Sequence, residues 1–269
     1  MASGRPVNGA APIGVFDSGV GGLTVVAALQ RLLPRESILY LGDTARLPYG
    51  TKSPSTVLAY SKKNVDFLVG RGVKAVVVAC NTASAVAVGE LRPSVPLWGV
   101  LQPGAARAAA VSRGRVGVIA TESTIDSDAY GRELRRLRPD LEVVSQPCPL
   151  FVPLVEEGWH DDPVAFEVAR RYLAPLVASG VDTLVLGCTH YPLLRDVIAE
   201  VMGPEVTLVD SAAAVAEVVA ADLLRHQLAS DAVGEAEHHF CVTDAGSRFA
   251  RIGARFLGAG ALSLEWVDV

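Results

Sequence analysis

The chain has 269 residues, of which 50% are hydrophobic and 20% charged, and its formal net charge is −5. This composition is typical of a globular protein, and the acidic balance argues against a nucleic-acid-binding surface, which is normally basic. Apolar runs are far shorter than the roughly 18 residues that would cross a membrane, so we expect no membrane association.

The chain begins with a small, polar stretch, MASGRPVNGA, without the apolar core of a signal peptide. We expect residues 1–10 to form a loose tail. The four cysteines include no Cys-x-x-Cys pair, and their spacing suits neither a disulfide framework nor a zinc site. The sequence therefore predicts a cytoplasmic protein without a metal ion.

Eight short apolar runs, rich in Val, Ile and Leu, follow one another along the chain. They lack strict alternation, as expected for strands that are buried on both faces of a parallel sheet. Helical patterns bounded by Pro or Gly separate them. The runs are 13–16, 38–42, 75–80, 97–101, 116–120, 141–145, 183–188 and 206–210. This alternation predicts a doubly wound α/β fold with mainly parallel sheets.

Two of these runs lie in similar segments. Residues 71–83 read RGVKAVVVACNTA and residues 179–191 read SGVDTLVLGCTHY, so in both a Gly-Val pair leads through an apolar strand to a cysteine. This coarse repeat favours two similar α/β lobes. After residue 211 the chain continues with a helical pattern, an expected strand at HHFCVTD (238–244) and a final helix.

Polar residues follow five of the predicted strands at their carboxyl ends, where ligands of open α/β sheets bind. They supply hydroxyls, amides, one imidazole and two thiols, together with free N–H groups at helix N-termini. The segments are FDSGVGGLTV (16–25), GDTARLPYG (42–50), CNTAS (80–84), ATESTIDS (120–127) and CTHYP (188–192). The pattern predicts a pocket for a small anionic molecule with several hydrogen-bonding groups.

The cofactor motifs that would suit this fold are incomplete. Thr24 stands where the third glycine of a dinucleotide-binding fingerprint would be, and there is no Walker A loop. A pyridoxal enzyme needs a Schiff-base lysine. All the lysines of the chain precede the second cysteine segment: Lys52, Lys62, Lys63 and Lys74. We therefore expect chemistry without a cofactor.

The cysteines divide into two pairs by position. Cys148 and Cys241 are interpreted as small buried hydrophobes. Cys80 and Cys188 lie at the ligand edge, where a helix N-terminus would lower a thiol's pKa. Two thiols across a pocket suit a reaction that removes a carbon-bound proton from one face and returns it on the other. A single-thiol hydrolase with Cys188 and His190 is less favoured, because residues two apart in a loop rarely face each other and Cys80 would have no role.

The segments FDSGVGGLTV, GDTARLPYG, ACNTAS and GCTHYPLL, in this order and spacing, resemble the bacterial glutamate racemases of the cofactor-independent aspartate/glutamate racemase superfamily. The resemblance extends from about residue 13 to the end of the chain and is weakest after residue 225. It implies two pseudo-symmetric lobes, residues 11–101 plus 211–269 and residues 102–210, with the active site between them. It also implies an isomerase that needs no cofactor or metal, a homodimer of the bacterial cytoplasm that makes D-glutamate for peptidoglycan.

The resemblance also assigns roles by position. Cys80 would act as the base on D-glutamate, assisted by Asp17, and Cys188 as the base on L-glutamate, assisted by His190. The residues that would contact the substrate are Asp17, Ser18, Pro48, Tyr49, Gly50, Asn81, Thr82, Thr121, Thr124, Thr189 and His190.

Some of these assignments have alternatives. Asp17 would otherwise be a plain N-cap of the helix that begins near Gly21. Glu156 resembles an auxiliary acid of the family, although Glu157 beside it fits the same place. Two other functions stay open: an aspartate or hydantoin racemase with the same thiols and a different pocket, and a non-catalytic amino-acid-binding protein, which would not need both thiols.

Overall fold

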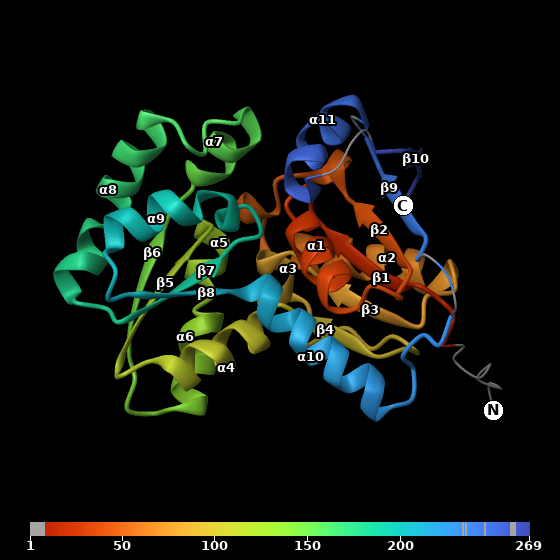
Figure 1. Cartoon of the computed structure of the whole chain (residues 1–269), viewed down its shortest axis with the longest axis horizontal. Helices are drawn as coiled ribbons and strands as arrows, with labels where there is room; N and C mark the ends of the chain where they lie inside the picture. The colour runs from red at the N-terminus through yellow and green to blue at the C-terminus, as the bar shows by residue number, and fades with distance from the viewer. Residues whose placement is uncertain (1–8, 233, 235, 245, 259–261) are drawn as a thin grey trace.

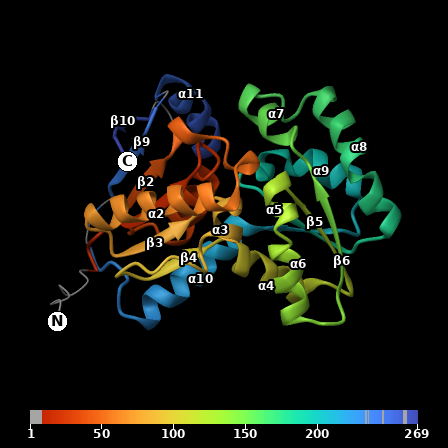
Figure 2. The same ribbon diagram turned by 180° about the vertical axis from the view of Figure 1, so that it is seen from behind.

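The computed structural model, shown in Figure 1 and from behind in Figure 2, describes residues 9–232, 234, 236–244, 246–258 and 262–269. The predicted tail therefore lies outside the described residues except for Gly9 and Ala10. The strands are β1 Ile13–Asp17, β2 Ile38–Gly42, β3 Ala75–Val78, β4 Leu97–Gly99, β5 Arg115–Ala120, β6 Glu142–Pro147, β7 Thr183–Gly187, β8 Thr207–Asp210, β9 His238–Val242 and β10 Leu264–Trp266.

Helices connect most of these strands. The α-helices are α1 Leu23–Leu32, α2 Pro54–Gly70, α3 Asn81–Val86, α4 Leu101–Val111, α5 Glu122–Asp126, α6 Ala129–Leu137, α7 Phe151–Glu157, α8 Pro163–Ser179, α9 Arg195–Met202, α10 Ser211–Arg225 and α11 Gly246–Leu257. Three short 3-10 helices in the described residues are η1 Thr44–Arg46, η2 Tyr49–Thr51 and η3 Tyr191–Leu194.

The strands form two sheets, with the orders β10-β9-β2-β1-β3-β4 (the first sheet) and β6-β5-β7-β8 (the second sheet). All adjacent pairs of these strands are parallel. The run β2-β1-β3-β4 of the first sheet has the same arrangement as the whole second sheet, and the two similar cysteine segments end the corresponding strands β3 and β7. The predicted α/β class with parallel sheets is confirmed.

Helices cover both faces of the first sheet. Helix α2 packs on β1, β2 and β3, whereas α1 contacts both α10 and α11 on the opposite face, nearest the viewer in Figure 1. Because both faces are covered, β1, β2 and β3 are buried along their whole length. This explains why their sequences are continuous apolar runs rather than alternating ones.

The two sheets draw on different parts of the chain. The first sheet contains β1 to β4 together with β9 and β10, and the second contains β5 to β8. Helix α10, which follows β8, packs against α1 and also against α4. The division of the chain into lobes at residues 11–101 plus 211–269 and at residues 102–210 stays a prediction.

Some boundaries differ from those expected. The strands predicted at 75–80 and 183–188 end at Val78 and Gly187, so both cysteines lie just beyond the sheet. Leu101, expected at the end of a strand, is the first residue of α4. The chain also adds β10 after α11, although a helix was expected as its last element. This strand has three residues and a largely exposed Trp266, so it shows no apolar run.

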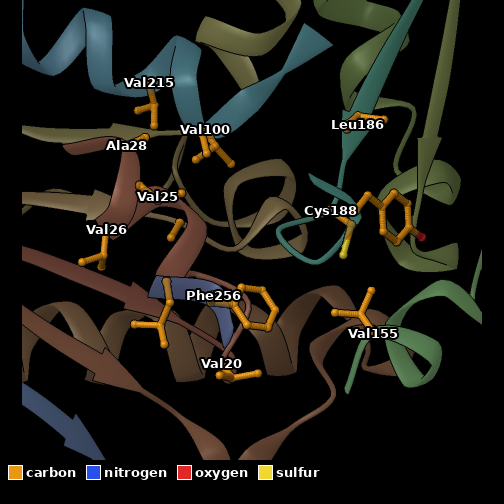
Figure 3. Close-up of a cluster of buried hydrophobic side chains, with 14 of the residues drawn as sticks. Val20, Val25, Val26, Ala28, Val100, Val155, Leu186, Cys188, Val215 and Phe256 are labelled. Atoms are coloured by element: carbon orange, nitrogen blue, oxygen red, sulfur yellow. The ribbon is translucent and has the colours of Figure 1, made fainter. Parts of the chain in front are cut away.

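One cluster of buried apolar side chains extends from the first sheet to the second. It includes Val25 of α1, Val215 of α10, Leu186 of β7 and Val155 of α7, and Figure 3 shows Phe256 of α11 in the same cluster. Burial of each such side chain contributes roughly 1.5–3 kcal/mol. This continuous core holds the two sheets against each other and so fixes the relative positions of their strand ends.

Candidate active site

The carboxyl ends of both sheets meet at a cavity of about 180 Å³. In each sheet the winding reverses between two central strands, β1 and β3 in the first and β5 and β7 in the second. Such switch points open a crevice in which ligands bind. The predicted site residues that line the cavity are Ser18, Pro48, Tyr49, Gly50, Cys80, Asn81, Thr82, Thr121, Glu156, Cys188, Thr189 and His190. Asp17 and Thr124 lie behind this lining.

Cys80 comes from the first sheet, two residues beyond β3. It is the N-cap of α3, its Sγ accepts a hydrogen bond from the Ala83 N–H at 3.5 Å, and Ser18 Oγ lies 3.8 Å away. Burial, followed by the charge of Asp17, raises the pKa of Cys80 to about 12. The Ala83 N–H at the helix N-terminus lowers this pKa, as expected, but it does not offset the loss of hydration, so the net shift is upward.

Cys188 comes from the second sheet and contacts His190. Its Sγ lies 3.9 Å from Nδ1 of the imidazole. The expectation that these two side chains do not face each other is wrong, because the loop turns tightly into η3, with the Tyr191 N–H bonded to the Cys188 carbonyl oxygen at 3.1 Å. A thiol and an imidazole within reach of each other are also what a thiol hydrolase needs. That reading still leaves Cys80, across the same cavity, without a role.

The other ring nitrogen of His190 contacts a carboxylate. Nε2 lies 3.2 Å from Oε1 of Glu156, whereas Glu157 is more than half exposed and contacts Arg248. Burial opposes the charge of the His190 imidazole, but its hydrogen bonds with Cys188 and Glu156 outweigh burial and raise its pKa to about 10. The imidazole is therefore protonated at neutral pH and bonded to Glu156 rather than Glu157.

Asp17 ends β1 and is almost fully buried. Its Oδ2 accepts a hydrogen bond from the Gly19 N–H at 2.9 Å, and its Oδ1 lies 3.5 Å from the Thr189 hydroxyl of the second sheet. Burial raises the pKa of Asp17, although the charge of His190 and the loop N–H groups oppose it. The N-cap interpretation is wrong, since α1 begins at Leu23 with Gly22 as its N-cap and no side-chain cap.

Three threonine hydroxyls join the two sheets beside the cavity. Thr82 of α3 lies 3.0 Å from the Thr121 hydroxyl and 3.1 Å from that of Thr124, and the latter two are 3.0 Å apart. Each hydroxyl can donate one hydrogen bond and accept others. Thr82 and Thr121 line the cavity, so Thr124 supports them from behind.

Other polar groups of the site are held by residues that the sequence analysis missed. The Asn81 side-chain oxygen accepts a hydrogen bond from the Tyr130 hydroxyl at 2.6 Å, and its amide contacts Ser211 Oγ at 3.5 Å. The Tyr49 hydroxyl donates to the Asp43 carboxylate. Tyr130 lies on α6, away from any strand end, so no local pattern indicated it. Ser211 directly follows β8, and this position at a strand end is the signal that could have indicated it.

The cavity itself contains few charged groups. Of the described residues that line it, none is a lysine or arginine, so hydroxyl and backbone groups would hold an anionic ligand beside His190. Within the same part of the chain, no group of three or more His, Cys, Asp and Glu side chains is placed to hold a metal ion. None of the helices described here has both the length and the apolar character needed to cross a membrane.

Several known proteins that are similar to this chain in sequence and fold are racemases. A family model described as Asp/Glu/Hydantoin racemase matches residues 13–219. The glutamate racemase of Geobacter metallireducens is 56% identical over 249 residues, covering 91% of this chain and 92% of that protein.

Two solved structures are similar over almost the whole chain. A glutamate racemase isoform from Bacillus anthracis has a TM-score of 0.93 at 40% identity, covering 96% of this chain and 98% of that one. The glutamate racemase from Francisella tularensis in complex with D-glutamate has a TM-score of 0.91 at 38% identity, covering 97% and 98%.

Proposed function

Because the chain belongs to the glutamate racemases of the Asp/Glu/Hydantoin racemase family, we propose that it interconverts L- and D-glutamate by proton transfer between two thiols. The observation that carries this proposal is that Cys80 and Cys188, from opposite sheets, line one cavity. Inverting a carbon centre requires an acid and a base on opposite faces, and two thiols can exchange these roles. The bound D-glutamate of the Francisella tularensis relative supports glutamate as the substrate.

The reaction needs no change of oxidation state. From L-glutamate, the thiolate of Cys188 takes the α-proton, so that an S–H bond forms and the electron pair of the broken C–H bond stays on carbon. The thiol of Cys80 then gives its proton to the opposite face. From D-glutamate the two cysteines exchange roles, and the thiols return to their starting states through solvent. The family resemblance supports this assignment of faces.

The surroundings of the two thiols differ in a way that suits them to complementary roles. A protonated His190 beside Cys188 stabilises negative charge on that sulfur once its proton leaves. The raised pKa of Cys80 keeps it protonated until it is needed as an acid and makes its thiolate a stronger base. Asp17, buried behind the cavity, contributes to this raised pKa, which supports its role as the partner of Cys80.

We extend the proposal to the substrate contacts. The hydroxyl, amide and backbone groups lining the cavity would bind the ammonium and the two carboxylates of glutamate. They belong to Ser18, Pro48, Tyr49, Gly50, Asn81, Thr82, Thr121, Thr189 and His190, with Asp17 and Thr124 behind them and Glu156 as the auxiliary acid. We also propose, on the family resemblance, a cytoplasmic homodimer that supplies D-glutamate for peptidoglycan and so for cell-wall growth and cell shape.

The test is incubation of purified, reduced protein with L-glutamate or D-glutamate in heavy water, followed by chiral separation and proton NMR of the α-hydrogen. We expect each substrate to approach an equal mixture, with one solvent deuteron at the α-carbon of the product. Cys80→Ala and Cys188→Ala should each lose about 10²–10⁴-fold in racemisation, the usual contribution of an acid or base.

Other outcomes would identify the alternatives. Inversion of aspartate in preference to glutamate would indicate an aspartate racemase. Binding of glutamate without deuteron incorporation would indicate a binding protein. Wild-type rates of racemisation in either single cysteine variant would refute the two-thiol mechanism.

A further inference from the structure

The C-terminal helix α11 belongs with the first sheet but contacts the proton-transfer groups of the second. Figure 1 shows α11 and α7 facing each other at the same end of the molecule. From α11, Arg248 Nη2 lies 3.1 Å from Oε2 of Glu156. From the last turn of the same helix, the ring of Phe256 packs edge-on against His190, with centroids 5.6 Å apart and an angle of 89°.

These contacts form a continuous series that ends at a reacting thiol. Oε2 of Glu156 bonds to Arg248 and Oε1 bonds to His190 Nε2, so the carboxylate is held from both sides. The imidazole in turn places Nδ1 3.9 Å from Cys188 Sγ. A carboxylate with one fixed oxygen can rotate, whereas one with both oxygens engaged keeps its orientation and that of its partner.

We propose that Arg248 is a positioning residue for the reaction: it fixes Glu156 so that the protonated His190 keeps its Nε2–H on that carboxylate and presents its Nδ1–H to Cys188. The inference rests on the proposed function and extends its proton-transfer groups to α11, an element to which the sequence analysis gave no role. Arg248 lines no part of the cavity, so it would act only through Glu156.

The exposed fractions of the three side chains distinguish a positioning role of Arg248 from a contribution to folding stability. The side chain of Arg248 is 53% exposed, whereas those of Glu156 and His190 are 19% and 8% exposed. An ion pair with one solvated partner contributes little to folding stability. The effect of Arg248 on the orientation of the mostly buried Glu156 carboxylate is larger than its effect on stability, because hydrogen bonds are stronger and less easily replaced away from water.

The pH dependence that we expect for the reaction follows from the charges around Glu156 and His190. Glu156 faces His190 and Arg248, with Glu157 beside it on α7, and His190 also faces Cys188 and the charge of Asp17. Burial raises the pKa of Glu156, but its contacts with His190 and then with Arg248 outweigh burial and lower it. Loss of Arg248 therefore lets Glu156 take up a proton at a higher pH. His190 then faces a neutral carboxyl group instead of a negatively charged carboxylate.

The first experiment compares kcat and KM as functions of pH in Arg248→Ala, Arg248→Lys and the control Arg251→Ala, which removes an exposed arginine from the same helix. We expect Arg248→Ala to lower kcat roughly tenfold, with KM within about twofold, the pattern of an interaction that matters in the transition state. In Arg248→Ala the acid limb of the curve of kcat against pH should move to higher pH by about one unit. Arg248→Lys should recover most of both effects, and Arg251→Ala should resemble the wild type.

A second measurement does not depend on turnover. NMR titration of the His190 imidazole, assigned with His190→Asn, should show its pKa falling by about one unit in Arg248→Ala, because a loosened carboxylate supports the imidazolium less well. A rise in the pKa of His190 would mean that Arg248 affects the imidazolium only by repulsion between their positive charges, and it would overturn the positioning role. Unchanged kcat, acid limb and titration would also overturn it. A wild-type protein inactive on glutamate would refute the proposed function, while this titration would still decide the role of Arg248.

Discussion

At the scale of single residues, a close approach between the loops of the two sheets at the site depends on Gly21. A Cβ atom at this position would overlap Thr189 Oγ1 and lie 2.5 Å from His190 Nδ1. The neighbouring Thr24 hydroxyl donates to the Thr189 carbonyl oxygen at 3.1 Å, so the two loops are also bonded here. The absence of a side chain at Gly21 therefore lets the imidazole take its place beside Cys188.

We predict that Gly21→Ala lowers kcat by about 10²-fold, because it displaces His190 by a fraction of an ångström or more from the Cys188 thiol, to which we assign proton transfer. The matched control is Gly70→Ala at the end of α2, where an added Cβ meets nothing within 4 Å. That variant should keep full activity and gain up to about 1 kcal/mol in the free energy of unfolding. Wild-type turnover in Gly21→Ala would show that the close approach is not required.

The raised pKa of His190 makes a second prediction about stability and pH. Its folded-state pKa of about 10 lies above its ordinary value of about 6.5. The charged form therefore stabilises the fold fully below about pH 6.5, and this contribution is lost as the pH rises through about 10. The difference in free energy of unfolding between the wild type and His190→Asn should be largest near pH 6 and smallest above pH 10.

Urea titrations in reducing buffer across this range measure that difference. His226→Asn, at an exposed histidine, is the control for the replacement itself. A difference between the wild type and His190→Asn that stays constant from pH 6 to above pH 10 would contradict the assignment of a protonated His190.

At the scale of elements, a buried ion pair joins four segments at the end of the first sheet opposite the site. Lys74, just before β3, places Nζ 2.5 Å from Oε2 of Glu36, just before β2, and also donates to the Gly9 carbonyl oxygen. Oε1 of Glu36 accepts from the Ser230 N–H at 2.7 Å. Both side chains are almost completely buried, so each depends on the other for its charge to be tolerated.

We predict that Lys74→Met lowers the free energy of unfolding by about 3–5 kcal/mol, because it leaves Glu36 buried without its counter-charge. The double variant Lys74→Met with Glu36→Leu should recover most of the loss. Urea unfolding of the two single variants and the double variant measures the coupling. If the double variant loses more free energy of unfolding than the two single variants lose together, the pair is needed for reasons other than charge balance.

At the scale of the whole molecule, the two sheets share one apolar core, and both contribute loops to the cavity between them. Residues from both sheets line this cavity, among them Cys80 and Cys188. A ligand there would contact both halves of the structure and bind only the folded chain. Its binding free energy therefore adds to the stability of the whole molecule.

We predict that D-glutamate at about 100 times its Kd raises the free energy of unfolding by about 2.7 kcal/mol. The measurement is thermal unfolding of Cys80→Ala, which avoids turnover, with D-lysine as the control ligand because its side chain carries a cation instead of a carboxylate. A Tm that is equal with both ligands would contradict specific binding of glutamate in the cavity.

The sequence by itself was enough to predict the parallel α/β class, most strand positions and the placement of the polar segments near one another. These features depend on local properties: continuous apolar runs predict strands buried on both faces, and the residues after a parallel strand lie at the ligand edge. The short edge strand β10 escaped because its three residues carry no such pattern.

Only the tertiary structure decided how the site residues interact. The raised pKa of Cys80 depends on burial by both sheets and on the charge of Asp17, and the imidazole of His190 faces Cys188 because of a turn that periodicity does not indicate. The choice of Glu156 over Glu157 and the contact with Arg248 depend on helices far apart in the chain. Hydration, charge and hydrogen bonding are set by neighbours in space, so the candidate site residues were visible in the sequence and their protonation states were not.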